Sequence, residues 1–417
     1  MANEFQFDAL PPAKMASKMA EVGVKKAGLN TWTMFVLAML AGAFIGAGAI
    51  FCTVVTTGLA AAGVGYGIIK LLGGLVFCLG LVAVVVAGAE LFTGNNLLIM
   101  AFASRKITGA QLLRNWGIVY VGNFVGSILL ALIMVLTRQY TSAGGAIGAN
   151  ALAIATGKCR LDFIQAIALG IMCNALVCLA VWLCLSARST TDKILAILFP
   201  ITAFVAAGFE HSVANMYFIP MGLLIKTFAG TTFWDAIGQT AADYSALTWG
   251  AFFLKNLLPV TIGNVVGGAG FVGLTYWFIY LRPQRVVEVK PGVAPKILIV
   301  DDDRDFIELN TTILTQEGYE VSAAANGHEA LQLMKADRPD LVLLDVMMAT
   351  PLEGVSVARK MEGDIALKDI PIIMISSIDS SKHAGLLPDD LHIPIDAWIS
   401  KPLDPDDLLK TIRRFLA

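Results

Sequence analysis

The chain has 417 residues, of which 57% are hydrophobic and 15% are charged, against roughly 25% charged residues in an ordinary globular protein. The net charge of −2 conceals two halves of opposite sign: residues 1–294 contain 18 Lys and Arg against 10 Asp and Glu, whereas residues 295–417 contain 12 against 22. This composition predicts a basic membrane part followed by an acidic soluble part. It excludes a disulfide-rich secreted mini-protein, a disordered chain and a basic nucleic-acid binder, so no nucleic-acid partner is expected.

The N-terminal stretch 5–28 mixes apolar residues with lysines and is predicted to form a helix at the bilayer interface. Long uncharged runs then predict six membrane spans, at roughly 31–55, 68–102, 115–137, 163–186, 194–225 and 247–281. The second and fifth are too long for one span, and polar residues interrupt them. Lys and Arg gather at one set of span ends, and six spans return the chain to its starting side. We therefore expect both termini in the cytoplasm and the protein in the inner (cytoplasmic) membrane.

A sequence repeat relates the two interrupted spans. Three residues of the second span recur 120 residues later in the fifth: Gly88, Glu90 and Asn95 recur as Gly208, Glu210 and Asn215. A second set, from Asn115 to Gly126, recurs 141 residues later as Asn256 to Gly267. An odd number of spans in each unit puts the two copies in opposite orientations, and paired interruptions in inverted repeats point to a substrate path.

Three ionisable residues fall within these interruptions, and ionisable groups at membrane depth are costly unless they are paired or functional. For Glu90 and Glu210 we expect a structural role, in which each carboxylate accepts hydrogen bonds from N–H groups of the broken helices. His211 differs, because an unperturbed imidazole, with a pKa of about 6.5, exchanges a proton near neutral pH.

The residues around these breaks resemble the formate/nitrite transporter family. The resemblance rests on residues 90–93 (ELFT), Lys158, Asn174, residues 208–220 (GFEHSVANMYFIP) and a C-terminal part that includes residues 259–264 (PVTIGN). It covers about residues 1–283 and implies an aquaporin-like protomer of six helices built from inverted three-helix repeats. It also implies a homopentamer with one pore per protomer, which conducts small monovalent anions such as formate and nitrite and is not an enzyme.

The resemblance also implies roles for individual pore residues. His211 and Thr93 would line a central chamber with Asn174 near them, and Lys158 would lie at the outer mouth. The apolar constrictions would be formed by Phe77, Leu81, Leu91, Phe92, Val177 and Phe204. A bare anion pays several kcal/mol or more to enter an apolar slit. We therefore expect Lys158 to attract the anion, and His211, or water that it polarises, to protonate it.

The soluble part follows a linker that contains three prolines, and its hydrophobic period changes at Lys296. Five short apolar runs lie at 297–300, 321–324, 341–344, 372–375 and 397–399, and they alternate with amphipathic segments near 305–316, 327–336, 354–362, 379–387 and 405–416. This pattern predicts a (βα)₅ flavodoxin-like domain with a parallel sheet. The expected domains are an N-terminal helix at 1–30, a channel at 31–283, a linker at 284–295 and the α/β domain at 296–417.

Polar residues follow the predicted strands, where ligands bind in such sheets. Asp301 and Asp302 end the first strand, Asp345 the third and Ser376 the fourth, and Lys401 follows the fifth. Three carboxylates brought together repel one another and favour a hard divalent cation such as Mg²⁺. Together with Lys401, that cation would neutralise a phosphoryl group on Asp345.

Residues 295–417 resemble the receiver domain of two-component response regulators. The resemblance implies that Asp345 is the phospho-acceptor and Asp302 the direct metal ligand supported by Asp301, with the Met347 carbonyl completing the Mg²⁺ site. Ser376 would be the switch hydroxyl, Trp398 the switch aromatic residue and Lys401 the phosphate-binding lysine. A histidine kinase or another phosphodonor is the expected partner. The loop after Asp345 is one residue longer than usual, which puts the switching geometry in doubt.

Two hypotheses follow from the combination. In the first, phosphorylation of Asp345 controls an anion channel. In the second, the channel is constitutive, and the receiver acts as a signalling relay or a phosphate sink.

Overall fold

The computed structural model describes residues 9–282, 293–348, 350, 352–376 and 395–416. It contains two compact units, Met1–Arg282 and Pro283–Ala417, which are considered separately below. The predicted amphipathic segment at 379–387, most of the predicted linker and the first eight residues lie outside the described residues.

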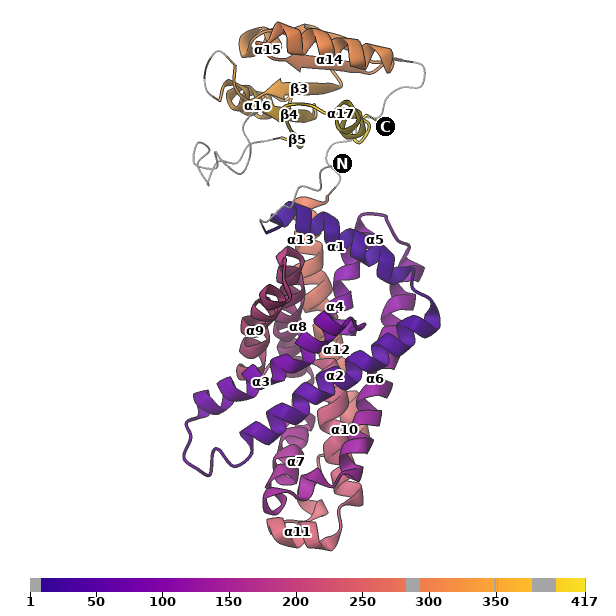
Figure 1. Cartoon of the computed structure of the whole chain (residues 1–417), viewed down its shortest axis with the longest axis vertical. Coiled ribbons are helices and arrows are strands. Elements are labelled where there is room, and N and C mark those ends of the chain that lie inside the picture. Colours follow the sequence, from indigo (N-terminus) through magenta and orange to yellow (C-terminus); the bar gives the residue numbers. More distant parts are fainter. Residues whose placement is uncertain (1–8, 283–292, 349, 351, 377–394, 417) are drawn as a thin grey trace. The chain divides into compact units, whose positions relative to one another are not determined.

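The first unit is helical throughout its described part (Figure 1). Its longer helices are α1 (Pro12–Ala27), α2 (Thr31–Thr56), α3 (Tyr66–Ala87), α6 (Gly109–Leu136), α7 (Ala146–Cys159), α8 (Phe163–Ser186), α9 (Thr190–Ala206) and α10 (Ser212–Phe228). Shorter helical segments are α4 (Phe92–Asn95), η1 (Asn96–Leu98), α5 (Ile99–Ala103), α11 (Thr231–Ile237), η5 (Ala251–Leu257), α12 (Leu258–Val265), η6 (Val266–Leu274) and α13 (Thr275–Tyr280).

Among the described residues, five helical stretches are long and apolar enough to cross a membrane, and a sixth is added if α10 and α11 count as one span bent by 112°. The predicted second span is divided into α3 and the short helices α4, η1 and α5, and the predicted fifth into α9 and α10. Both long spans are therefore broken where the polar residues fall. The helix α7, which the hydrophobic runs did not predict, precedes the second repeat as α1 precedes the first.

The repeat predicted from the sequence is visible in the helix packing. Helix α2 packs on α3 and α6, and helix α8 packs on α9 and α12. At both crossings a glycine lets the backbones touch: a Cβ at Gly126 would overlap the Met39 carbonyl oxygen, and a Cβ at Gly267 would overlap the Ile171 carbonyl oxygen. Small residues permit such close approach between helices in membranes. The short helix α4 of the first repeat contacts the longer helix α10 of the second.

The second unit is a five-stranded parallel sheet, as predicted, and its strand order is β2-β1-β3-β4-β5. Its strands are β1 (Lys296–Val300), β2 (Glu320–Ala324), β3 (Leu341–Asp345), β4 (Ile372–Ser376) and β5 (Ala397–Ser400). The described helices are α14 (Arg304–Gln316), α15 (Gly327–Ala336), α16 (Glu353–Gly363) and α17 (Pro405–Ile412). Every residue of β3 and β4 is buried, as expected for central parallel strands. The carboxyl ends of β1 and β3 adjoin at one edge, where Asp301 and Asp345 lie.

Candidate functional site

The two interrupted spans break in the same way. Helix α3 ends at Ala87 and helix α9 at Ala206. Gly88 and Gly208, which follow them, have φ angles of 81° and 73°, a conformation that costs side-chain-bearing residues more than glycine. Two residues later the chain is held by equivalent backbone bonds: the Glu90 amide donates to the Leu37 carbonyl (3.2 Å) and the Glu210 amide to the Leu169 carbonyl (3.3 Å). The two glutamates are therefore placed by matching backbone geometry.

In the first repeat, Glu90 is the centre of a buried polar network. Lys26 Nζ lies 2.8 Å from Glu90 Oε1 and 2.9 Å from Asn95 Oδ1. Asn95 Nδ2 donates to Glu90 Oε2 (2.7 Å) and to Asn115 Oδ1 (2.9 Å). Asn115 Nδ2 in turn donates to the Lys26 carbonyl (3.2 Å). The carboxylate charge is thus neutralised at membrane depth, as buried charges require.

The second repeat contains the same network. Lys158 Nζ lies 2.8 Å from Glu210 Oε1, and both side chains are largely buried, at 17% and 6% exposure. Glu210 Oε2 accepts from Asn215 Nδ2 (2.7 Å) and from Asn256 Nδ2 (3.1 Å). Asn256 Nδ2 also donates to the Lys158 carbonyl (3.0 Å). We had expected the two glutamate side chains to accept from helix N–H groups, and this expectation is wrong: their described donors are lysine and asparagine side chains.

Two other asparagines accept from the backbone at the breaks instead. The Phe92 amide donates to Asn123 Oδ1, and the Ser212 amide donates to Asn264 Oδ1, each at 2.9 Å. The amide group of Asn123 donates to the carbonyls of Ala38 and Glu90, and that of Asn264 donates to the carbonyls of Gly170 and Glu210. The unwound backbone is therefore hydrogen-bonded without water, which a bilayer interior demands.

His211 and Thr93 are hydrogen-bonded to each other, one from each break. His211 Nε2 lies 2.9 Å from Thr93 Oγ1, and His211 Nδ1 accepts from the Ala214 amide at 3.0 Å, so that the ring is the N-terminal cap of α10. A backbone N–H can only donate, and Nδ1 is therefore unprotonated. The neutral ring must carry its proton on Nε2 and present it to Thr93.

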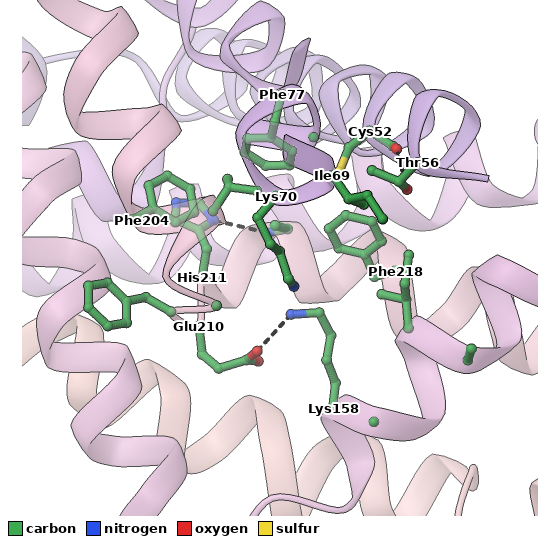
Figure 2. Close-up of a pocket in the computed structure, with 18 of the residues that line it drawn as sticks. Cys52, Thr56, Ile69, Lys70, Phe77, Lys158, Phe204, Glu210, His211 and Phe218 are labelled. Carbon is green, nitrogen blue, oxygen red and sulfur yellow. Dashed lines mark hydrogen bonds and ion pairs between the residues drawn. The ribbon is translucent and has the colours of Figure 1, made fainter. Parts of the chain in front are cut away.

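Two cavities approach this pair. The first, here called the Lys158 cavity, has a volume of about 500 Å³ and is lined by Lys70, Phe77, Lys158, Phe204, Glu210 and His211 among others (Figure 2). The second, here called the Lys26 cavity, has about 430 Å³ and is lined by residues that include Lys26, Leu81, Glu90, Leu91, Gly94 and Asn95. His211 lines the Lys158 cavity, whereas Thr93 is not among the lining residues of either cavity and directly precedes Gly94, which lines the Lys26 cavity. The His211–Thr93 bond therefore lies next to a wall residue of each cavity.

The apolar residues expected at the constrictions fall into three groups. Phe77 and Phe204 line the Lys158 cavity with their rings in edge contact, at a centroid distance of 5.8 Å, and Phe204 stacks on His211. Leu81 and Leu91 line the Lys26 cavity. Phe92 packs on Trp116 and Tyr120, and Val177 is buried; neither is among the residues that line the two cavities.

Asn174 is buried beside the central pair. Its Nδ2 lies within hydrogen-bonding distance of the Thr93 carbonyl (3.2 Å), Asn96 Oδ1 (3.0 Å) and the Asn264 carbonyl (2.7 Å). It therefore ties the Thr93 backbone to the second repeat. Its Oδ1 has no hydrogen-bond donor among the described residues.

In the second unit, the predicted acidic cluster forms at the carboxyl edge of the sheet. Carboxylate oxygens of Asp301, Asp302 and Asp345 lie within 4.8 Å of one another. Lys401 Nζ contacts Asp301 Oδ2 at 2.7 Å and Asp345 Oδ2 at 3.6 Å. Burial, and then repulsion from Asp301, raises the pKa of Asp345 to about 6. The cluster thus carries uncompensated negative charge, which a divalent cation would relieve.

The remaining predicted receiver residues lie around this cluster. Ser376 is buried at the end of β4, and its carbonyl accepts from the Lys401 amide (2.7 Å). Trp398 lies on β5, and its buried Nε1 has no acceptor among the described residues. The Met347 amide donates to the Asp345 carboxylate. The longer loop after Asp345 still ends in a tight contact, because a Cβ at Gly354 would overlap the Asp345 carbonyl oxygen.

Comparison with known proteins identifies both parts. The sequence model described as "Formate/nitrite transporter" matches residues 13–278. The chain belongs to the formate/nitrite transporter family. A second model, "Response regulator receiver domain", matches residues 297–413, so this family member carries a fused receiver domain. The chain is 48% identical over 276 residues to the formate channel FocA of Escherichia coli K12, covering 66% of this chain and 96% of FocA.

Other family members give the same result. A probable formate transporter of Methanothermobacter thermautotrophicus is 41% identical, with 65% of this chain and 96% of the relative covered. A solved structure described as a pentameric formate channel with formate bound is 51% identical with a TM-score of 0.58, covering 60% of this chain and 98% of that one. These relatives are channels and transporters rather than enzymes, and the transporter unit of this chain is a multi-pass membrane protein.

Sequence reasoning missed two cations. Lys26 occupies the place in the first repeat that Lys158 occupies in the second, and a spacing of 132 residues relates them. The same spacing relates the contacts at Met39 and Ile171, so a search for the repeat upstream of Glu90 could have found Lys26. Lys70, a wall residue of the Lys158 cavity, has no counterpart in the repeat and gave no signal beyond being a lone charge in an apolar run.

Proposed function

We propose that the transporter unit forms a homopentameric channel in the cytoplasmic membrane for small monovalent anions, formate first and nitrite second. The supporting observation is the buried His211–Thr93 pair, which adjoins two cavities that are each lined by a lysine–glutamate pair. The relatives named above are formate channels, and one of them is pentameric. Both termini lie in the cytoplasm in this proposal, with the channel at 31–283, the linker at 284–295 and the receiver at 296–417.

Passage depends on removing the charge of the anion before the apolar segment. Lys158 and Lys26 raise the anion concentration in their cavities by electrostatic attraction. The cavity walls include apolar residues, Phe77 and Phe204 in the Lys158 cavity and Leu81 in the Lys26 cavity, and a bare anion that loses its hydration beside such residues pays several kcal/mol. A protonated weak acid avoids most of that cost, so the acid form crosses and returns its proton to water on the far side.

His211 acts in this proposal through Nε2. Because Nδ1 accepts from the Ala214 amide, a second ring proton would break the α10 cap. The neutral ring therefore donates a hydrogen bond from Nε2 to the anion or to the Thr93 hydroxyl and keeps its own proton. The ring polarises a water molecule that supplies the proton to the anion, and the hydroxide left behind takes up a proton from the bulk water on the entry side. Asn174 holds the Thr93 backbone in place.

Uptake of formate and nitrite into proteoliposomes that contain the full chain tests the transport proposal. We expect saturable uptake of both anions that increases as the pH falls, because the acid form is the species that crosses. Thr93→Val should lower uptake, whereas Thr93→Ser should retain it. Uptake that is independent of pH and unaffected by Thr93→Val would contradict the proposed mechanism.

For the receiver, we propose phosphorylation of Asp345 by a histidine kinase or another phosphodonor. The three converging carboxylates fit a Mg²⁺ ion held by Asp301, Asp302 and Asp345, with the Met347 carbonyl as a further ligand. When bound, Mg²⁺ would neutralise charge on the phosphoryl oxygens. Lys401, already in contact with two of these carboxylates, pairs with the phosphate, and Ser376 donates to it. Trp398 reports the change as the switch aromatic residue.

We further propose that this phosphorylation controls the channel. The test measures flux through the full chain with Mg²⁺, with and without beryllofluoride, in the wild type and in Asp345→Asn. A beryllofluoride effect that disappears in Asp345→Asn supports control by the receiver. Equal flux in all four conditions supports the alternative, in which the channel is constitutive and the receiver relays or drains phosphate.

A further inference from the structure

The Lys158 cavity contains a second cation that the proposed mechanism does not use. Lys70 lies in the first turns of α3 and is half-buried. Figure 2 shows its ammonium group pointing into the cavity toward that of Lys158. Among the described residues, no carboxylate lies within ion-pairing distance of Lys70; its described contact is with the Tyr66 ring, 5.4 Å from the centroid.

Glu210 is not available to neutralise Lys70. One of its oxygens is paired with Lys158, and the other accepts from Asn215 and Asn256. The cavity therefore carries two ammonium groups and one carboxylate that is already engaged. Its other lining residues, such as Ile69, Phe77 and Phe218, are mostly apolar, so they carry no charge that would offset that of Lys70.

Lys158 also retains hydrogen-bonding capacity, in contrast to its counterpart Lys26. Lys26 Nζ donates both to Glu90 Oε1 and to Asn95 Oδ1. Lys158 Nζ donates to Glu210 alone among the described residues, and the equivalent oxygen, Asn215 Oδ1, has no donor there. An ammonium group has three N–H donors, so Lys158 can serve a ligand without releasing Glu210.

We propose that Lys70 and Lys158 together form a second anion-binding subsite, reached before His211, which takes a small carboxylate or inorganic monoanion. This inference rests on the proposed transport function, because the ligand is the anion that the channel carries. An anion between the two ammonium groups relieves their repulsion and accepts from both. The cavity volume of about 500 Å³ leaves water around the anion, so it binds weakly and moves on.

The subsite makes a specific kinetic prediction. Loss of one unpaired cation in contact with the anion weakens binding about fivefold in a water-filled cavity. Lys70→Gln should therefore raise the half-saturating formate concentration about fivefold at low ionic strength. Maximal flux should stay within about twofold, because His211 and the apolar segment are unchanged. The shift should shrink in high salt, and Lys70→Arg should behave as the wild type.

The matched control is Lys255→Gln. Lys255 is exposed and adjoins Asn256, which contacts the Lys158 carbonyl. The substitution therefore removes the same charge at the same end of the unit but outside this cavity. Formate uptake by the full chain in proteoliposomes is measured for all variants. Unchanged half-saturation in Lys70→Gln, or an equal shift in Lys255→Gln, would overturn the subsite. A shift in Lys70→Gln alone, rescued by arginine, supports it.

A second measurement separates this proposal from the transport proposal. Cys52 already lines this cavity, so the second measurement uses a Cys52→Ser background, in which Ala60→Cys places a thiol in the lining. Labelling of that thiol by anionic and cationic methanethiosulfonates reads the local charge without any transport. The anionic-to-cationic rate ratio should fall several-fold when Lys70→Gln is added and stay constant when Lys255→Gln is added. An unchanged ratio overturns the subsite even if formate is carried. Absent formate uptake with a falling ratio refutes the transport proposal and leaves the anion site.

Discussion

The substitution His211→Asn separates two functions of one side chain. His211 caps α10 through Nδ1 and contacts Thr93 through Nε2. Asparagine is among the best N-terminal caps, whereas alanine at that position costs about 1 kcal/mol. We therefore expect His211→Asn to retain thermal stability and His211→Ala to lose about 1 kcal/mol.

The effect on transport should be the same in both variants. A hydrogen bond to a charged group contributes roughly 1.5–3 kcal/mol, and a factor of ten corresponds to about 1.4 kcal/mol. Loss of the Nε2 donor should therefore lower formate uptake about 10- to 100-fold. The assay is initial uptake into proteoliposomes beside thermal unfolding of the same preparations. Wild-type uptake by a stable His211→Asn protein would refute the role assigned to the ring.

Three further predictions concern other parts of the molecule. Lys26→Gln should raise the half-saturating anion concentration for transport that starts from the Lys26 cavity, which is measured in vesicles of known protein orientation. Because the substitution leaves Glu90 buried without its cation, it should also lower the unfolding temperature. An unchanged melting curve would argue against the ion pair. Mg²⁺ binding to the full chain, followed by calorimetry, should weaken as the pH falls through about 6, because the raised pKa of Asp345 lets protons compete there; a midpoint near 4 would contradict this. Gly354→Ala should destabilise the receiver by about 1–3 kcal/mol and slow acetyl-phosphate labelling of Asp345, since the new methyl group overlaps the Asp345 carbonyl; wild-type labelling would show that the loop can yield.

The breaks in the two long spans could be predicted because they contain polar and ionisable residues, which are rare inside a membrane. In both long spans a glycine is followed two residues later by a glutamate, a pattern that does not fit a continuous membrane helix. In the structure, Gly88 and Gly208 adopt left-handed backbone conformations at these breaks. The predicted strands agree closely with β1 to β5 because each contains a short apolar run. The central strands β3 and β4 are buried throughout, and aspartates mark the carboxyl ends of β1 and β3.

Other features could not be predicted from the chain alone. Lys26 and Glu90 are 64 residues apart, and no local pattern in the basic N-terminal helix indicates which lysine reaches the break; only the spacing of 132 residues between Lys26 and Lys158 does so. The prediction of the hydrogen-bond donors to Glu90 and Glu210 was also wrong. The backbone amides at the breaks donate to Asn123 and Asn264 instead of to the two glutamates. The 14-residue helix α7 escaped prediction because it is too short for a span, although it delivers Lys158.

In the proposed mechanism, a hydrated anion meets the His211–Thr93 pair between the two cavities. The most direct measurement is an experimental structure of the full chain in the presence of formate. We predict an anion within hydrogen-bonding distance of His211 Nε2 and Thr93 Oγ1, with the Ala214 amide still bonded to Nδ1. A continuous anion path that bypasses the ring, with His211 enclosed by protein on every side, would contradict it.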